Sequence, residues 1–154
     1  MRFSDVITII SGGTPKTTNP AYWNGSIPWI SIKDFAPVNR YITSTEKSIT
    51  LEGLKNSATN LLQKDDIIIS ARGTVGEIAL IPYEMSFNQS CYGLRSKGQL
   101  SSQYLFYWLK ANKEKLLQNV HGAVFDTITK TSFDNLEIEI PEPALERHIV
   151  DTVC

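Results

Sequence analysis

Hydrophobic residues recur along this chain at two different spacings, and the change of spacing predicts where helices and strands lie. Near the N-terminus, Phe3, Val6, Ile7 and Ile10 follow helical spacing, and Gly12 comes directly after them. Glycine often ends a helix because it adopts positive φ without steric cost. We therefore predict a short amphipathic helix over residues 3–11.

The middle of the chain has the pattern of a β-sheet. Residues 27–32, 41–43, 67–69, 77–81 and 87–94 are short apolar or alternating runs, and each is predicted as a strand. Residues 72–76 contain two glycines and predict the turn of a hairpin between the third and fourth of these strands. Thr50 is placed to cap a helical turn that continues through Leu54.

Helical spacing returns from Ser101, where Leu105, Trp108, Leu109 and Leu116 fall on one face and predict a helix to about residue 119. Thr129 is placed to cap a short helix through residue 135. Residues 136–140 alternate between apolar and acidic side chains and predict a half-buried strand that Pro141 ends. Together these patterns predict an α+β fold with a β-rich N-terminal lobe and a smaller α+β C-terminal lobe.

The charge of the chain is nearly balanced overall but unevenly distributed. The 15 basic and 16 acidic side chains give a formal net charge of -1, so composition alone does not indicate a nucleic-acid-binding protein. Residues 1–130 carry 14 basic and 10 acidic side chains, a balance of +4, whereas residues 131–154 carry 1 basic and 6 acidic, a balance of -5. We expect the C-terminal stretch to face solvent or a protein partner and not phosphate.

Cysteine and histidine usage indicates neither a disulfide framework nor a metal site. Cys91 lies within an apolar strand pattern and Cys154 is the last residue, while His121 and His148 lack neighbours at metal-ligand spacing. No apolar run approaches the roughly 18 residues of a membrane span. The predicted protein is soluble, cytoplasmic and without a cofactor of its own.

A polar loop after Gly12 carries the most specific motif in the chain. Gly12-Gly13-Thr14-Pro15 is followed by Tyr22-Trp23-Asn24-Gly25-Ser26-Ile27-Pro28-Trp29. This pattern resembles the target-recognition domains of type I restriction-modification specificity subunits. Further segments match the same family in the same order: Ile49-Thr50 with Gly53-Leu54 and Ser57, Ile69 to Gly76, Asn88-Gln89-Ser90, Tyr104 to Leu109, Gly122-Ala123, and Ile138 to Pro141.

The resemblance implies a module that recognises double-stranded DNA and has no catalytic activity. Methyltransferase and endonuclease subunits would be its partners, and S-adenosylmethionine, ATP and Mg²⁺ would be bound by them. Residues 1–143 correspond to one target-recognition domain. Residues 144–154 correspond to the start of the conserved helix that docks with the methyltransferase, here truncated and without the Gln that the family usually has, which suggests a fragment or a half-length subunit.

Candidate DNA contacts are exposed polar residues in the predicted loops, since Arg reads guanine and Asn or Gln reads adenine in the major groove, while Lys and Thr hold phosphates. They are Lys16, Thr17, Thr18, Asn19, Lys33, Arg72, Thr74, Asn88, Gln89 and Lys130, with His121 and Asp126 beside Lys130 in the second lobe. Arg72 and Asn88-Gln89 are recurrent family positions, so they either read bases or hold loops and grip backbone. Lys33-Asp34 is either a phosphate contact or an ion pair or clamp within the domain.

Two other functions are open on the residues alone. Tyr22, Trp23 and Trp29 on a polar loop are consistent with a carbohydrate-binding module, although such aromatics more often pack beneath a loop. A small hydrolase that uses Ser70 or Ser90 with His121 is a third reading, without the G-x-S-x-G motif. Asp65 and Asp66 are adjacent in an extended segment and point to opposite faces, so a solvated turn is favoured over a catalytic pair.

Overall fold

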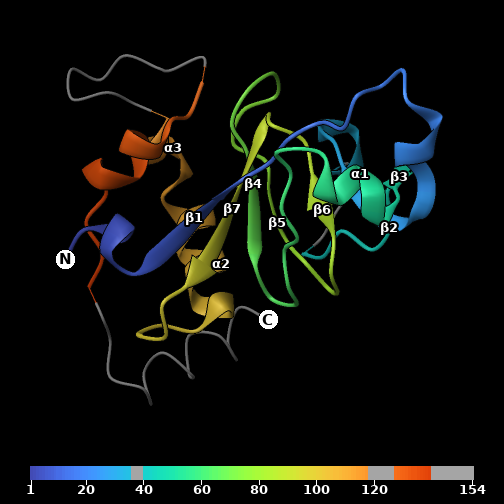
Figure 1. The fold of residues 1–154 in the computed structure, drawn as a ribbon. Coiled ribbons are helices and arrows are strands. Elements are labelled where there is room, and N and C mark those ends of the chain that lie inside the picture. Colours follow the sequence, from blue (N-terminus) through green and yellow to red (C-terminus); the bar gives the residue numbers. More distant parts are fainter. Residues whose placement is uncertain (36–39, 118–126, 140–154) are drawn as a thin grey trace.

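Two β-sheets form the centre of the molecule, and helical segments lie beside both of them (Figure 1). The computed structural model describes residues 1–35, 40–117 and 127–139. The first sheet has the order β1 (Ile7–Ser11), β7 (Cys91–Ser96), β4 (Ile67–Ser70), β5 (Ile78–Leu80), and all its neighbouring strands are antiparallel. The second has the order β3 (Lys47–Ile49), β2 (Trp23–Ile30), β6 (Ser86–Phe87), with β2 antiparallel to β3 and parallel to β6. The predicted α+β class is confirmed.

The α-helices are α1 (Leu51–Lys55), α2 (Ser102–Ala111) and α3 (Lys113–Leu116). The 3₁₀ helices are η1 (Phe3–Asp5), η2 (Pro20–Tyr22), η3 (Ile32–Phe35) and η4 (Lys130–Asn135).

The predicted N-terminal helix is wrong. Only Phe3–Asp5 is helical, as one 3₁₀ turn, and β1 begins at Ile7 and pairs with β7. Ile7-Thr8-Ile9-Ile10 is a run of β-branched residues, which pack better on a pleated sheet than in a helix. Four apolar positions in so short a segment fit both periods, and pairing with β7 decides between them.

The predicted strand over 87–94 is also corrected, because the chain changes sheets within it. β6 ends at Phe87, residues 88–90 form a turn, and β7 begins at Cys91 in the other sheet. The strand predicted over 27–32 starts earlier, at Trp23, and ends at Ile30, while Ile32 begins η3; β3 was not predicted. The Ile67–Ile69 strand and its hairpin partner are confirmed.

The capped helical turn after Thr50 is confirmed, since the Thr50 hydroxyl accepts a hydrogen bond from the Gly53 N–H at 3.1 Å. The predicted helix from Ser101 divides at Asn112 into α2 and α3. The short helix after Thr129 is present as η4. Residues 41–43 and 136–139 form single bridges in place of strands, although Leu136 and Ile138 are buried and Glu137 and Glu139 exposed, as the alternation predicts. The helix predicted from residue 144 lies outside the described residues.

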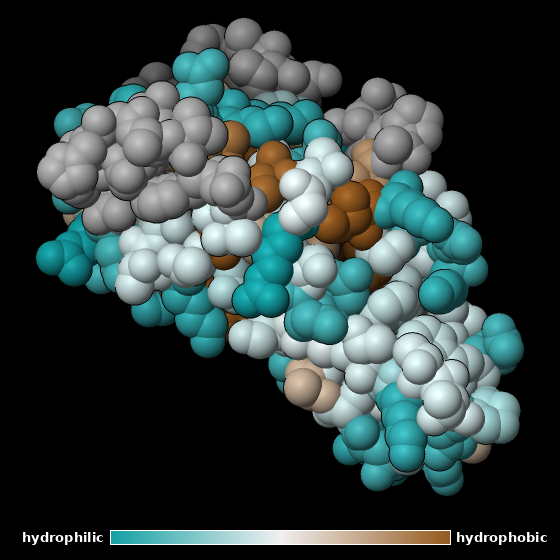
Figure 2. Space-filling view, turned by 90° about the horizontal axis from the view of Figure 1, so that it is seen from above, coloured by the Kyte–Doolittle hydropathy of each residue, from teal (hydrophilic) through white to brown (hydrophobic). Residues whose placement is uncertain are grey.

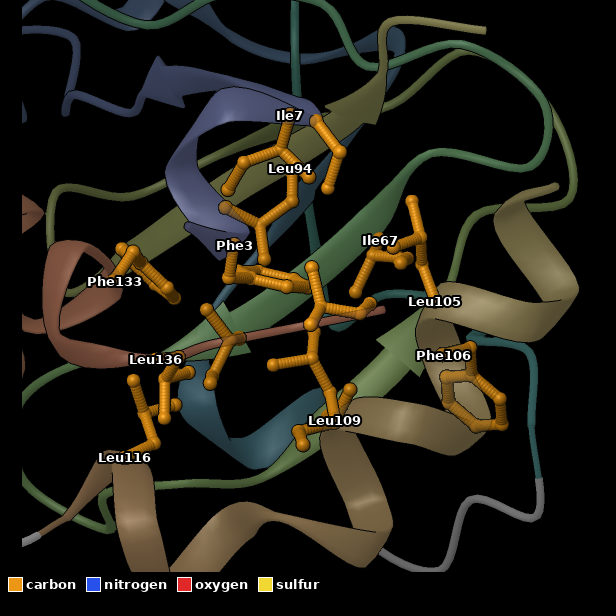
Figure 3. Close-up of a cluster of buried hydrophobic side chains, with 14 of the residues drawn as sticks. Phe3, Ile7, Ile67, Leu94, Leu105, Phe106, Leu109, Leu116, Phe133 and Leu136 are labelled. Carbon is orange, nitrogen blue, oxygen red and sulfur yellow. The ribbon is translucent and has the colours of Figure 1, made fainter. Parts of the chain in front are cut away.

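One hydrophobic core joins the helices to the first sheet (Figure 3). Phe3 is fully buried in it and stacks on Trp108, with ring centroids 5.0 Å apart. A second core fills the opposite face of the same sheet and includes Ile30, Ile68 and Phe87. Ile67 and Ile69 belong to the first core and Ile68 to the second, which explains why β4 is apolar at every position.

Candidate nucleic-acid interface

The register of the strands brings four loops to one end of the two sheets. In the first sheet, Ser11 pairs with Tyr92 and Ser70 with Cys91, so β1 and β4 end where β7 begins. In the second sheet, β2 and β6 run parallel and end together, with Ile30 opposite Phe87. The loops that follow these strand ends, residues 12–19, 31–35, 71–77 and 88–90, therefore lie at the same end, which we call the loop end.

Backbone hydrogen bonds connect the loops within and between the two sheets. The Gly13 N–H, after β1 of the first sheet, donates to the Phe87 carbonyl of β6 in the second sheet at 3.0 Å, and the Asn88 N–H, after β6, donates to the Ile30 carbonyl of β2 at 3.0 Å. The Ala71 N–H donates to the Ser90 carbonyl at 2.7 Å. Figure 2 looks down on this end and shows hydrophilic residues around a few hydrophobic ones near the middle of the molecule. The predicted site residues of these loops thus share one face, although they are far apart in sequence.

Arg72 and Thr74 lie at the tip of the β4–β5 turn, and both are exposed. Ser70 shapes this turn: its hydroxyl donates to the Thr74 carbonyl and accepts from the Glu77 N–H at 2.8 Å. Gly73 and Gly76 have positive φ, as tight turns require. Within the described part of the chain, the Arg72 guanidinium has no hydrogen bond or ion pair, so its planar donor fork is available to a ligand.

The loop that carries Lys16 to Asn19 is held from beneath by two tryptophans. The Trp23 indole N–H donates to the Lys16 carbonyl at 3.1 Å, and the buried Trp29 indole donates to the Gly13 carbonyl at 3.0 Å. The two rings meet edge to face with centroids 5.2 Å apart. Lys16, Thr17 and Thr18 are exposed, whereas Asn19 accepts from the Ala21 N–H at 3.0 Å and caps η2.

Asn88 and Gln89 were predicted at the start of a strand. They occupy instead the turn between β6 and β7. The Asn88 side-chain oxygen accepts from the Ser90 N–H at 3.0 Å and holds this turn. The Gln89 side-chain oxygen accepts from the Thr14 hydroxyl, and this bond ties the turn to the first loop. Both side chains thus hold loops, which is one of the two roles predicted for them.

Lys33 and Asp34 have different roles. Asp34 is a clamp within the domain: its carboxylate accepts from the Ser31 N–H at 2.8 Å and from the Glu46 N–H at 3.0 Å. Lys33 is exposed in η3, and no ion pair among the described residues includes it. The clamp fixes η3 and leaves the Lys33 ammonium group at the loop end.

Lys130 reaches the same end through its neighbour Ile128. The Ile128 N–H donates to the Ala71 carbonyl at 2.8 Å, so the chain before η4 lies against the β4–β5 turn. Lys130 is exposed two residues later. His121 and Asp126 lie outside the described residues.

Sequence reasoning missed two residues that support the loop end. The buried Thr59 hydroxyl donates to the Phe87 carbonyl at 2.7 Å and accepts from the Phe87 N–H at 3.2 Å. The Asn60 amide donates to the Ser11 carbonyl at 2.7 Å. No pattern near residues 59–60 could have indicated this, since both partners are remote backbone groups.

The structure does not support the catalytic alternatives, a small hydrolase or another enzyme built on a reactive side chain. Ser70 is fully buried, with its hydroxyl used inside the turn. Burial raises the pKa of the Cys91 thiol to about 12, which disfavours the reactive thiolate. The prediction of a solvated turn is wrong for Asp66, which is buried and paired with Arg95. Within residues 1–35, 40–117 and 127–139, no cluster of metal-ligating side chains occurs, and no helix is long and apolar enough to cross a membrane.

Two of the three aromatic residues that suggested a carbohydrate-binding module, Trp23 and Trp29, make contacts within the fold. Trp29 is buried, Trp23 is half-buried against it, and both indole N–H groups are used on loop carbonyls. Neither ring is a free stacking platform.

Comparison with known proteins gives the same family that the motifs indicated. The family model of the type I restriction modification DNA specificity domain matches residues 1–153, so the chain belongs to this family. A type I restriction enzyme specificity subunit of Methanocaldococcus jannaschii, MjaIX, is 28% identical over 151 residues, which are 96% of this chain and 35% of that protein. The EcoR124I/EcoR124II specificity subunit of Escherichia coli is 28% identical and matches 91% of this chain and 36% of its own length.

Solved structures agree on the fold. The HsdS subunit from Thermoanaerobacter tengcongensis superimposes with a TM-score of 0.74 at 20% identity, over 99% of this chain and 35% of that one. A chain from a study of complex assembly and conformational transition of the type I R-M system superimposes with a TM-score of 0.77 at 22% identity, over 99% of this chain and 36% of that one. The present chain spans about a third of the length of these proteins.

Proposed function

We propose that the loop end binds double-stranded DNA and reads its sequence, as the recognition module of a type I restriction-modification system. The observation that carries the proposal is that strand register brings the loops of exposed Lys16, Lys33 and Arg72 to one end of the sheets, and that the Ile128–Ala71 hydrogen bond brings the segment before exposed Lys130 to the same end. In the described structure none of these four cations is paired with a carboxylate. Phosphate contacts by lysines and base contacts by an arginine fork are the two components of sequence recognition.

Within this proposal, some loop residues contact the DNA and others hold the loops in position. The Arg72 tip and the loop over Lys16 to Thr18 are exposed and reach toward a ligand, whereas Asn88 and Gln89 hold the loops that present them. We assign base reading to the exposed residues and positioning to Asn88, Gln89 and Asn19. The chain is non-catalytic and acts in the cytoplasm, where methyltransferase and endonuclease subunits supply the chemistry; the names of its relatives support this role.

Duplex binding tests the proposal directly. The isolated chain is titrated with labelled duplex DNA at several salt concentrations, beside a panel of polysaccharides. We expect binding that weakens steeply with salt, with a non-specific Kd of about 10⁻⁴ to 10⁻⁶ M at physiological salt. Salt-independent DNA binding, or tight binding to a polysaccharide, would contradict the proposal.

A matched pair of variants tests the location. Replacing Lys16 and Lys33 by Gln removes two positive charges from the loop end. Replacing Lys64 and Lys97 by Gln removes two exposed charges, one before β4 and one after β7, at the opposite end of the first sheet. Each lost phosphate contact lowers the salt slope by about 0.9, so the first pair should lower it by roughly two and the second should leave it unchanged. Equal effects would show that only net charge matters.

A further inference from the structure

Lys113 lies against the β4–β5 turn, although it comes from the helical part of the chain. It is the first residue of α3, and its side chain passes over Gly76. A Cβ atom built on Gly76 would be 2.7 Å from the Lys113 Cε, and 3.4 and 3.7 Å from the two Leu117 methyl groups. Gly76 also has a φ of +89°. Glycine is therefore needed there for the backbone conformation, and the end of the Lys113 side chain lies over the space that a Cβ atom would enter.

The short turn places Lys113 close to the Arg72 tip. The Gly76 N–H donates to the Ser70 carbonyl at 2.9 Å, so the turn closes directly beneath Arg72 and Thr74. The stem of Lys113 is packed on this base and the residue is half-buried. A lysine whose stem is held by packing loses less rotamer freedom when its ammonium group binds a ligand than a fully exposed one does.

The charge of Lys113 is not neutralised within the described structure. The ion pairs found there join the N-terminal amine to Glu137 and Arg95 to Asp66. Two acids lie beside the residues of this contact: Glu77 follows Gly76 in the turn, and Glu114 follows Lys113 on α3 and is exposed. Neither is within ion-pair distance of Lys113. The loop end thus carries a cation, fixed by packing, that no sequence motif had indicated.

We propose that Lys113 binds a phosphate of the DNA backbone and thereby sets the register of the Arg72 tip against the bases, with Gly76 as the residue that makes room for it. This inference rests on the proposed function and assigns a positioning residue to the same site. A phosphate contact beside a base-reading arginine fixes orientation without carrying sequence information. Lys113 is therefore expected to act equally on all sequences.

The test compares Lys113→Ala with Lys115→Ala, which removes the same charge from the same short helix. Lys115 borders a different surface cavity together with Met1, Trp108 and Glu137. Binding of a duplex pool of random sequence is measured from about 0.05 to 0.3 M salt, because phosphate contacts weaken steeply over this range. Lys113→Ala should lower the salt slope by about 0.9. If the variant and the native chain have equal affinities at about 1 M salt, this change in slope makes the affinity of the variant about eightfold lower at about 0.1 M salt.

Further variants separate a phosphate contact from a loss of structure. Lys113→Arg should keep the slope, and Gly76→Ala, which displaces the Lys113 stem, should reproduce the loss of slope in the fraction that thermal unfolding shows to be folded. An unchanged slope in Lys113→Ala, or the same loss in Lys115→Ala, would overturn the assignment while duplex binding by the native chain leaves the proposed function in place. Absence of salt-dependent duplex binding by the native chain would overturn both.

Discussion

Arg95 and Arg72 lie at opposite ends of the first sheet and carry the same guanidinium group, but they differ in their hydrogen-bond partners. Arg95, near the end of β7, donates three hydrogen bonds to Asp66, at 2.7 to 3.2 Å. Arg72, at the other end of the sheet, is exposed and has no such partner among the described residues. The first guanidinium group is used within the fold and the second is left for a ligand. An arginine's role in this protein therefore depends on whether a buried carboxylate lies within its reach.

The Arg95–Asp66 pair is expected to be a matter of stability alone. The Asp66 side chain is 5% exposed, and apart from Arg95 it accepts from the Gln63 N–H at 2.7 Å. Hydrogen bonding to Asp66 raises the pKa of Arg95, although burial opposes this, so the Arg95 guanidinium group is positively charged at any ordinary pH. Removing one partner of a buried pair leaves the other charge uncompensated.

The largest effect is expected from Arg95→Ala. It should lower the free energy of unfolding by about 3 kcal/mol, near the low end for a buried pair because the Arg95 side chain is partly exposed and water can replace it. Urea denaturation measures this loss, and duplex affinity of the folded protein should not change. Arg95→Lys, which keeps the charge without the fork, serves as the control and should lose less. A loss of DNA binding in fully folded Arg95→Ala would end the distinction between the two arginines.

The next effect is expected from Arg72→Lys and concerns sequence preference. A preferred site is first selected from a randomised duplex pool with the native chain. Arg72→Lys keeps the charge but loses the two parallel donors, so it should bind the selected site about 1 to 3 kcal/mol more weakly and accept several bases at one position. Its unfolding free energy should match that of the native chain. Equal weakening on every sequence would assign Arg72 to the phosphate backbone, and no weakening would leave it as a turn residue.

The smallest effect is expected from Lys130→Ala, which sharpens the contrast between reading and gripping. Lys130 is exposed next to the strand-end turn and carries a single charge without a planar fork. Its removal should lower the salt slope by about one unit and weaken all sequences alike. The same selection and salt titration used for Arg72→Lys measures both quantities. A relaxed preference at one base position would instead make Lys130 a reader.

Local patterns predicted those parts of the fold that local forces determine. The apolar run of β4, its glycine turn and the Thr50 cap are each specified within a few residues, and the structure has all three. The N-terminal helix failed because residues 3–11 fit two periods and only pairing with β7, more than 80 residues away, selects the strand. The single strand predicted over 87–94 failed for a similar reason, since the pattern does not say which sheet a residue joins.

The candidate site shows the same division. The loops that carry Lys16, Arg72 and Lys130 were predicted from their composition, but their meeting at one end follows from sheet order and strand register, which no local pattern contains. The positioning roles of Thr59 and Asn60 depend on backbone groups of distant segments. Lys113 was overlooked because its significance comes from the space above Gly76 and not from its own neighbours in sequence.

The way in which the loop of residues 12–19 is held affects which substitutions it tolerates during evolution. Trp23 and Trp29 hold the loop by the carbonyl groups of Lys16 and Gly13, atoms that every amino acid provides. Substitutions at residues 16 to 18 therefore leave these anchors intact, and their exposed side chains are replaced without a cost in packing. Mutation can thus alter the chemistry that the loop displays while the platform beneath it persists, so new specificities are reachable by single, individually tolerated steps.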